Sequence, residues 1–192
     1  MAKLPSWRLS EWRTVDLIVV AVLAVSAGVM FIAWNTVYAV STIVFSFVFP
    51  GILALLDGMW LIGGLLPGLI VRRPGAALIG ELIASIVSAV IGNQWGFSVV
   101  LLGILQGLAI EAGFAIWRYQ SSRFVVVATA GVIGGLVQGA SELFIWYPNA
   151  NSTFFLVYLA SATLSGAALG GGVAYALAAG LRRTGILSTF GR

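Results

Sequence analysis

The feature that most constrains this chain is a succession of apolar runs, each roughly 20 residues long. A run of that length lets an α-helix cross the hydrocarbon core of a bilayer. Only 8% of the 192 residues are charged, whereas a soluble domain carries about 25%. The sequence therefore predicts an all-α integral membrane protein with a single membrane domain over residues 1–192.

Six of the apolar runs are predicted to be spanning helices. Their expected ranges are 15–34, 52–71, 75–92, 96–117, 124–147 and 153–181. A further apolar segment over residues 35–50 is short for a span. It is predicted to be re-entrant, interfacial or an extension of the first helix.

The placement of basic residues favours six spans over seven. If residues 35–50 do not cross the membrane, all ten Lys and Arg residues fall on one side. They are Lys3, Arg8, Arg13, Arg72, Arg73, Arg118, Arg123, Arg182, Arg183 and Arg192. Cytoplasmic loops are enriched in Lys and Arg, so both termini are predicted to be cytoplasmic.

The chain contains no cysteine and no histidine. Their absence excludes disulfides, thiolate nucleophiles, histidine-dependent catalysis and most zinc sites. No GxxxxGK[ST] loop is present either, so ATP binding by that route is excluded. No metal site, cofactor or enzymatic activity is expected.

Four acidic residues, Asp57, Glu81, Glu111 and Glu142, lie inside the apolar runs. No Lys or Arg lies at comparable depth to neutralise them. Ionisable groups in hydrocarbon are costly and rare, so each is a functional-site hypothesis. Acids without bases indicate a cationic ligand, a proton pathway or carboxyl groups held protonated.

Helical spacing places polar and small residues on shared faces of four predicted helices. These residues are Glu81, Ser85, Ser88 and Gly92; Gly103, Gln106, Gly107 and Glu111; Gly131, Gly134, Gly135, Gln138, Gly139 and Glu142; and Tyr158, Ser161, Thr163 and Ser165. They predict a polar cavity between the third to sixth helices. The alternative is that the hydroxyl and amide groups only hydrogen-bond the helices together.

Aromatic residues accompany the acids. Carboxylates with aromatic faces suit a flat organic cation, which gains cation–π and stacking contacts. Trp60, deep in the second helix, is the stacking candidate, and Tyr158 is expected among the rings around the cavity. Trp95, Trp146 and Tyr147 lie at the predicted outer boundary, where anchoring at the membrane interface is the favoured interpretation.

The first helix carries a face of small residues, Ala21, Ala24, Ala27 and Gly28. Small residues let helix backbones approach closely. The face has two interpretations, packing within the chain or docking onto a partner protein.

Two segments resemble signatures of the YkoE family. Residues 72–78 (RRPGAAL) followed by 80–84 (GELIA) form the first, and residues 106–112 (QGLAIEA) form the second. The stretch 142–144 (ELF) is also similar to that family. The resemblance covers roughly residues 50–147.

The resemblance implies an S component of an energy-coupling factor (ECF) transporter in a prokaryotic cell membrane. Such a subunit would bind thiamin or its hydroxymethylpyrimidine precursor from outside. It would work with a transmembrane coupling subunit and two cytoplasmic ATPases. By resemblance, Ala21, Ala24, Ala27 and Gly28 would meet the coupling subunit, and residues 35–50 would form a lid.

The resemblance also implies the ligand contacts. Glu81, Gln106 and Glu111 are expected to contact the ligand, together with Glu142. Trp60, Ser85, Tyr158 and Asn93, which lies in an outer loop, complete the predicted site.

Two other functions remain open from the residues alone. The first is a stand-alone proton- or cation-coupled carrier for an organic cation, although the chain lacks the internal repeat such carriers usually show. The second is an intramembrane enzyme relying on carboxylates. The sequence does not separate thiamin from hydroxymethylpyrimidine.

Overall fold

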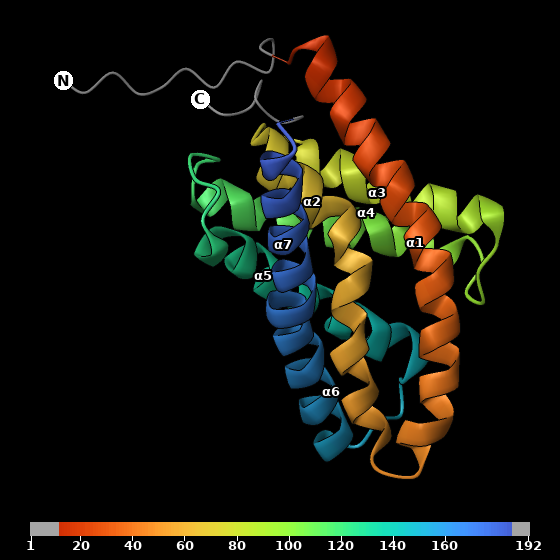
Figure 1. The fold of residues 1–192 in the computed structure, drawn as a ribbon. Helices are drawn as coiled ribbons and strands as arrows, with labels where there is room; N and C mark the ends of the chain where they lie inside the picture. The colour runs from red at the N-terminus through yellow and green to blue at the C-terminus, as the bar shows by residue number, and fades with distance from the viewer. Residues whose placement is uncertain (1–11, 186–192) are drawn as a thin grey trace.

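The computed structural model describes residues 12–185, and these residues are helical with no strand among them (Figure 1). The predictions for Lys3, Arg8 and Arg192 lie outside the described residues. The elements are α1 (Thr14–Ser46), η2 (Pro50–Leu61), α2 (Ile62–Val71), α3 (Ala76–Ile91), α4 (Ser98–Ile116), α5 (Phe124–Trp146), α6 (Ser152–Ser165), η3 (Gly166–Gly170) and α7 (Gly171–Arg183). Here η2 is a 3₁₀ helix and η3 is a π-helical turn.

These elements combine into six apolar helices, which confirms the predicted fold class. Five are long enough to span a membrane, because η2 continues into α2, and α6 continues through η3 into α7. The sixth, α3, has 16 residues and is shorter. The start of α1 and the end of α7 lie at the same end of the bundle in Figure 1.

The predicted end of the first helix at Trp34 is wrong, because α1 continues without a break to Ser46. Contacts with η2 hold the extension: the Trp34 indole donates to the Leu56 carbonyl at 3.0 Å, and Asn35 binds Trp60. The helix has 33 residues and is thus about 50 Å long, well beyond the roughly 30 Å hydrocarbon core. Residues 35–46 are therefore neither a separate lid nor a second crossing.

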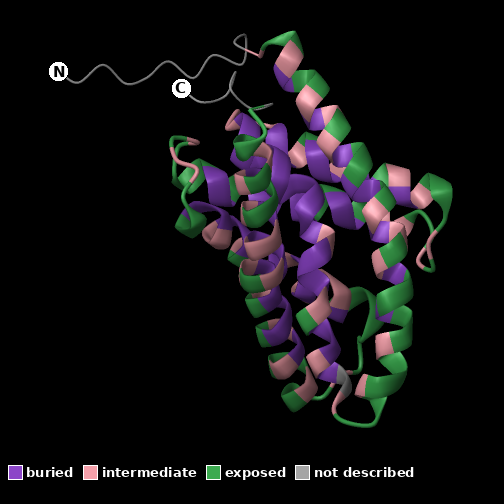
Figure 2. Cartoon of the chain, in the orientation of Figure 1, coloured by how far each residue is buried: buried purple, intermediate pink, exposed green. Residues whose placement is uncertain are grey.

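The centre of the bundle is α2, in which all ten residues are buried. Figure 2 shows this helix coloured as buried, while α1 carries a long exposed strip. A helix enclosed on every side can be apolar all round, whereas a peripheral helix exposes apolar residues to lipid. The exposed Val22, Val25 and Val29 of α1 fit the second case.

The small residues of α1 pack within the chain. Ala24 and Ala27 are buried, and Ala27 joins a small cluster with Ala84 of α3. A Cβ on Gly28 would lie 2.7 Å from the Ala84 carbonyl oxygen, so only glycine permits this approach. Three of the four residues predicted as a partner-docking face are thus buried within the chain, and Ala21 is half-buried.

A serine hydroxyl from α6 inserts into η2. Ser165 Oγ accepts the Gly58 N–H at 2.9 Å and donates to the Leu55 carbonyl at 2.6 Å. Both backbone groups of η2 thus have a side-chain partner from another element. Gly58 is required there, because a Cβ would collide with the Ser165 carbonyl. The hydroxyl thus supplies hydrogen bonds to a turn of η2 whose geometry is not α-helical. The π-helical η3 lies opposite this turn.

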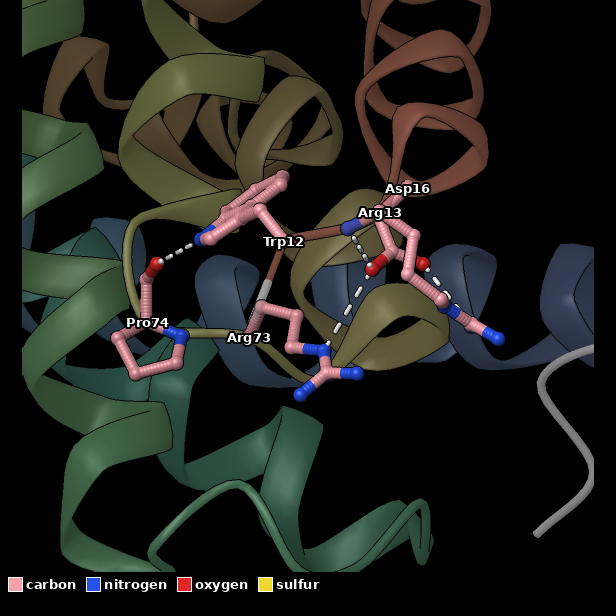
Figure 3. Close-up of polar contacts among 5 residues, drawn as sticks. All are labelled: Trp12, Arg13, Asp16, Arg73 and Pro74. Carbon is pink, nitrogen blue, oxygen red and sulfur yellow. Dashed lines mark hydrogen bonds and ion pairs between the residues drawn. The ribbon is translucent and has the colours of Figure 1, made fainter. Parts of the chain in front are cut away.

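At the end of the bundle where α1 begins, polar contacts tie α1 to the turn between α2 and α3 (Figure 3). The Asp16 side chain is fully buried and pairs with Arg13 at 3.1 Å and with Arg73 at 3.6 Å. The Trp12 indole donates to the Pro74 carbonyl at 3.2 Å. The carboxylate also accepts the Arg13 backbone N–H at 3.0 Å, as expected for an acid at a helix N-terminus.

Ser165→Ala tests the inserted hydroxyl. The substitution leaves the Gly58 N–H and the Leu55 carbonyl without their partner in an apolar interior, so we expect a loss of about 1–3 kcal/mol in stability. Ser141→Ala is the matched control, because that hydroxyl donates only to the Val137 carbonyl of its own helix. Thermal unfolding in one detergent, with both variants beside the parent chain, measures the difference. Equal midpoints for the two variants would contradict the assignment.

Candidate functional site

A cavity of about 300 Å³ lies among α1, η2, α3, α4, α5 and α6, a volume at the lower end of small-molecule sites. Carboxylates, amides and aromatic rings dominate its wall. The lining residues are Phe31, Asn35, Tyr38, Thr42, Leu53, Trp60, Glu81, Ser85, Ser88, Gln94, Trp95, Val99, Leu102, Gln106, Gln138, Glu142, Trp146, Tyr147 and Tyr158.

Six of the eight predicted ligand-binding residues line this cavity. They are Trp60, Glu81, Ser85, Gln106, Glu142 and Tyr158. The structure therefore brings together most of the polar stripes expected from helical spacing, but it does not place Glu111 or Asn93 among them.

The carboxyl group of Glu81 reaches the cavity from α3. Glu81 is 1% exposed, and its Oε2 atom has no hydrogen-bond partner. A buried acceptor without a partner is destabilising by roughly 1–3 kcal/mol, and by more when it is charged. The described residues supply no donor to this atom, so a donor on a bound ligand would complete it.

The carboxyl group of Glu142 on α5 is held by its neighbours. Tyr158 donates its hydroxyl at 2.7 Å and Gln138 donates its amide nitrogen at 3.1 Å. A carboxylate only accepts hydrogen bonds, so the amide nitrogen of Gln138 must face it. The Gln138 Oε1 atom is then left buried and without a partner.

A second amide, Asn35 of α1, is oriented in the same way. The Trp60 indole N–H donates to Asn35 Oδ1 at 2.9 Å. An indole nitrogen can only donate, which fixes the oxygen toward Trp60 and leaves Asn35 Nδ2 buried without a partner.

Sequence reasoning missed the contribution of α1 to the site because it ended the first helix at Trp34. Phe31, Asn35, Tyr38 and Thr42 line the cavity at spacings i, i+4, i+7 and i+11. These are the spacings of the polar stripe recognised on α3. The same spacing is visible in the sequence once the first helix is extended beyond Trp34.

Two groups of aromatic rings flank the polar atoms. Tyr38, Trp60 and Trp95 pack edge to face, with centroids 4.9 to 5.8 Å apart. Tyr147 and Tyr158 lie 5.3 Å apart. Trp95, Trp146 and Tyr147 were interpreted as interfacial anchors, yet all three line the cavity.

Asp57 lies behind the wall. It is completely buried and close to Glu142 and Tyr158, yet neither of its carboxyl oxygens has a hydrogen-bond partner. Of the four acids in the apolar runs, three thus gather in one region of the bundle: Asp57, Glu81 and Glu142.

The structure does not place Glu111 in the cavity wall, where its ligand contact was expected. Its Oε1 accepts the Gly75 N–H at 2.7 Å and the Tyr119 hydroxyl at 2.6 Å. Its Oε2 accepts the N–H groups of Ala77 at 3.0 Å and Leu78 at 3.3 Å. A carboxylate at a helix N-terminus is stabilised by unpaired N–H groups and by the helix dipole. Glu111 therefore caps α3 from α4.

Tyr119 completes this cap from the turn after α4. Burial raises the pKa of Tyr119 above its ordinary value, and the hydrogen bond to Glu111 and the negative charge of Glu111 raise it further. The hydroxyl consequently stays protonated and donates to the carboxylate across the physiological range.

Asn93 is also placed differently from the prediction. Its amide nitrogen donates to the Ser88 carbonyl at 3.2 Å, and its Oδ1 accepts the Trp95 N–H at 2.8 Å. The side chain thus shapes the loop between α3 and α4. Its effect on the cavity is indirect, through the position of Trp95.

The chemistry of the cavity is that of binding. Within residues 12–185, no group of three or more His, Cys, Asp and Glu side chains is arranged to hold a metal ion. The cavity offers carboxylates, two oriented amides and aromatic faces, which can bind a flat polar molecule.

The chain is similar to transport proteins. A family model described as "ABC-type cobalt transport system, permease component" matches residues 15–137. The chain is 28% identical over 181 residues to "Putative HMP/thiamine permease protein YkoE" of Bacillus subtilis (strain 168), covering 94% of this chain and 89% of that protein. It is also similar to "Crystal structure of an S-component of ECF transporter", with a TM-score of 0.86, 27% identity and coverage of 94% and 91%.

The different surroundings of two acids predict opposite effects on stability. Glu111→Gln places an amide NH₂ against N–H or O–H donors, and we expect a loss of about 1–3 kcal/mol. Glu81→Gln replaces a buried carboxyl group whose Oε2 has no partner with a neutral amide, so the unfolding midpoint of the ligand-free protein should stay equal or rise. Thermal unfolding of the two purified variants at one heating rate compares them. A similar decrease in both would show that the two carboxylates serve the same structural role.

Proposed function

The chain belongs to the family of ABC-type cobalt transport system permease components and has the fold of an ECF transporter S component; from this premise we propose that its cavity binds thiamin or its hydroxymethylpyrimidine precursor. The family and fold are those of a non-enzymatic, multi-pass subunit of the cell membrane. The identity of the ligand is our proposal.

The observation that carries the proposal is the set of unpartnered polar atoms in the cavity wall. Glu81 Oε2 and Gln138 Oε1 require donors, and Asn35 Nδ2 requires an acceptor. An aminopyrimidine has an exocyclic amine beside a ring nitrogen, so one edge of it presents both donors and an acceptor. The relative from Bacillus subtilis, whose printed name includes HMP/thiamine, supports the same ligand class.

The permanent positive charge of thiamin suits the acids in the wall. Glu81 and Glu142 line the cavity and Asp57 lies behind it. Lys and Arg are absent from the cavity wall. A thiazolium ring also gains from the faces of Trp60, Trp95 and Tyr38, at about 0.5–2 kcal/mol for each cation–π contact.

The donor set favours an organic ligand over the cobalt in the family description. Divalent transition metals bind tightly where several imidazole, thiolate or carboxylate groups converge. The chain has no His or Cys, and the described residues hold no group of three acids able to enclose an ion. Cobalt is therefore the comparison ligand in the test below.

We further propose that the subunit works with a transmembrane coupling subunit and two cytoplasmic ATPases. The solved structure it resembles is an S component, and the chain lacks an ATP-binding loop of its own. Because Ala27 and Gly28 are covered by α3 and Ala24 is buried, α1 would contact the coupling subunit through exposed residues such as Val22, Val25 and Val29.

We assign closure of the cavity over the ligand to the loops whose residues line the cavity wall. Gln94 and Trp95 lie between α3 and α4, and Tyr147 follows α5. These loops replace residues 35–50 as the proposed cover, because α1 is continuous through that segment to Ser46.

Calorimetry on the purified chain with thiamin, hydroxymethylpyrimidine, the thiazolium fragment and Co²⁺ tests the proposal. We expect thiamin or the pyrimidine to bind, and Co²⁺ to leave the heat signal unchanged. Binding of Co²⁺ alone would overturn the ligand assignment. Uptake by the chain alone in vesicles, driven by a proton gradient, would overturn the assignment of ATPase partners.

Glu81→Gln should weaken thiamin binding by about 1–3 kcal/mol, because a charged acceptor at the cavity wall becomes neutral. Calorimetric titration with thiamin measures the change. Ser26→Ala is the control on an exposed position, where the hydroxyl donates only to the Val22 carbonyl of its own helix. Unchanged affinity in the Glu81 variant, with the control also unchanged, would remove this acid from the site.

A further inference from the structure

We propose that Asn35 is a specificity-determining residue, which donates a hydrogen bond to an unprotonated ring nitrogen of the ligand. The inference rests on the proposed function and assigns the orientation of the aminopyrimidine ring. Asn35 would select rings that carry an acceptor at this point and disfavour rings of the same shape that lack one.

The position of Asn35 is the first support. It lies on α1, lines the cavity and is 8% exposed, so bulk water does not compete freely for its amide. A buried amide N–H without a partner is destabilising until a ligand acceptor meets it. A site built to hydrogen-bond one ligand atom discriminates strongly against an analogue that lacks that atom.

The fixed polarity of the amide is the second support. The Trp60 indole donates to Asn35 Oδ1 at 2.9 Å, and a donor-only group cannot accept from the amide nitrogen if the amide rotates. Tyr38 and Trp95 pack against the Trp60 ring with centroids 4.9 and 5.3 Å away. These contacts hold the indole in place, so the amide atom of Asn35 that is left for a ligand is the donor Nδ2.

The third support comes from the other walls. Gln138 presents an oxygen because its nitrogen is bound to Glu142, and Glu81 presents a carboxylate oxygen. One donor on α1 and two acceptors on α5 and α3 thus belong to residues that line one cavity. The acceptors match the two hydrogens of an exocyclic amine, and the donor matches the adjacent ring nitrogen.

The test compares two neutral ligands on the intact chain. One is 4-amino-5-hydroxymethyl-2-methylpyrimidine. The other is its carbocyclic counterpart, in which both ring nitrogens are CH groups. We expect the unmodified chain to bind the pyrimidine about tenfold or more tightly than the carbocycle, the size of one well-placed hydrogen bond.

Asn35→Asp keeps an oxygen for Trp60 and replaces the donor with an acceptor. We expect it to bring the ratio of the two dissociation constants to about threefold or less. Both titrations are run at a pH at which the free pyrimidine is unprotonated, so neither ligand carries a charge that the added carboxylate would attract. Ser41→Ala is the matched control on the same helix, because Ser41 lies outside the cavity wall and its hydroxyl already donates to the Val37 carbonyl. This control should keep the ratio.

A second variant covers the case in which Asn35→Asp does not fold. Trp60→Phe leaves Asn35 intact but removes the N–H that fixes its amide, and we expect it to lower the ratio as well. If the unmodified chain binds the pyrimidine and both folded variants keep its ratio, this inference is overturned while the proposed function stands. If the unmodified chain binds neither thiamin nor the pyrimidine, the proposed function fails and this inference fails with it.

Discussion

The structure depends on one constraint, that polar groups inside a bilayer find no water and must be satisfied by the protein or by a ligand. The chain meets this demand at many points with side chains from distant segments. Glu111 on α4 accepts three backbone N–H groups at the start of α3 and the hydroxyl of Tyr119. Ser165 on α6 pairs two backbone groups of η2. These contacts fix how the helices lie against one another.

The same constraint identifies the functional region by where it is not met. Within the described residues, the buried side-chain atoms without a partner belong to Asn35, Asp57, Glu81 and Gln138. Three of these residues line the cavity and the fourth, Asp57, lies beside Glu142. A protein retains such atoms at a stability cost where a ligand completes them. The polar atoms that hold the helices together thus have hydrogen-bond partners inside the chain. The unpaired polar atoms around the cavity do not.

The aromatic residues link the two regions. Trp60 belongs to the cavity wall, yet its indole also joins η2 to α1 through Asn35, as Trp34 does through the Leu56 carbonyl. The outer half of α1 is held in its helical form by these contacts. The cavity and the length of α1 are therefore consequences of the same packing.

The sequence by itself determined the membrane environment, the six helices and the importance of the buried acids. Hydropathy and helical period are local properties, and the energy of a carboxylate in hydrocarbon does not depend on the fold. Most of the polar stripe on α3 was therefore predictable, as were Gln106, Glu142 and Tyr158. Tertiary structure alone decided which acids meet. Glu81 and Glu111 each lie among small residues on an apolar helix, but helix rotation and depth bring one to the cavity and the other to the N-terminus of α3. Those quantities depend on contacts between segments far apart in the chain, which no local pattern encodes.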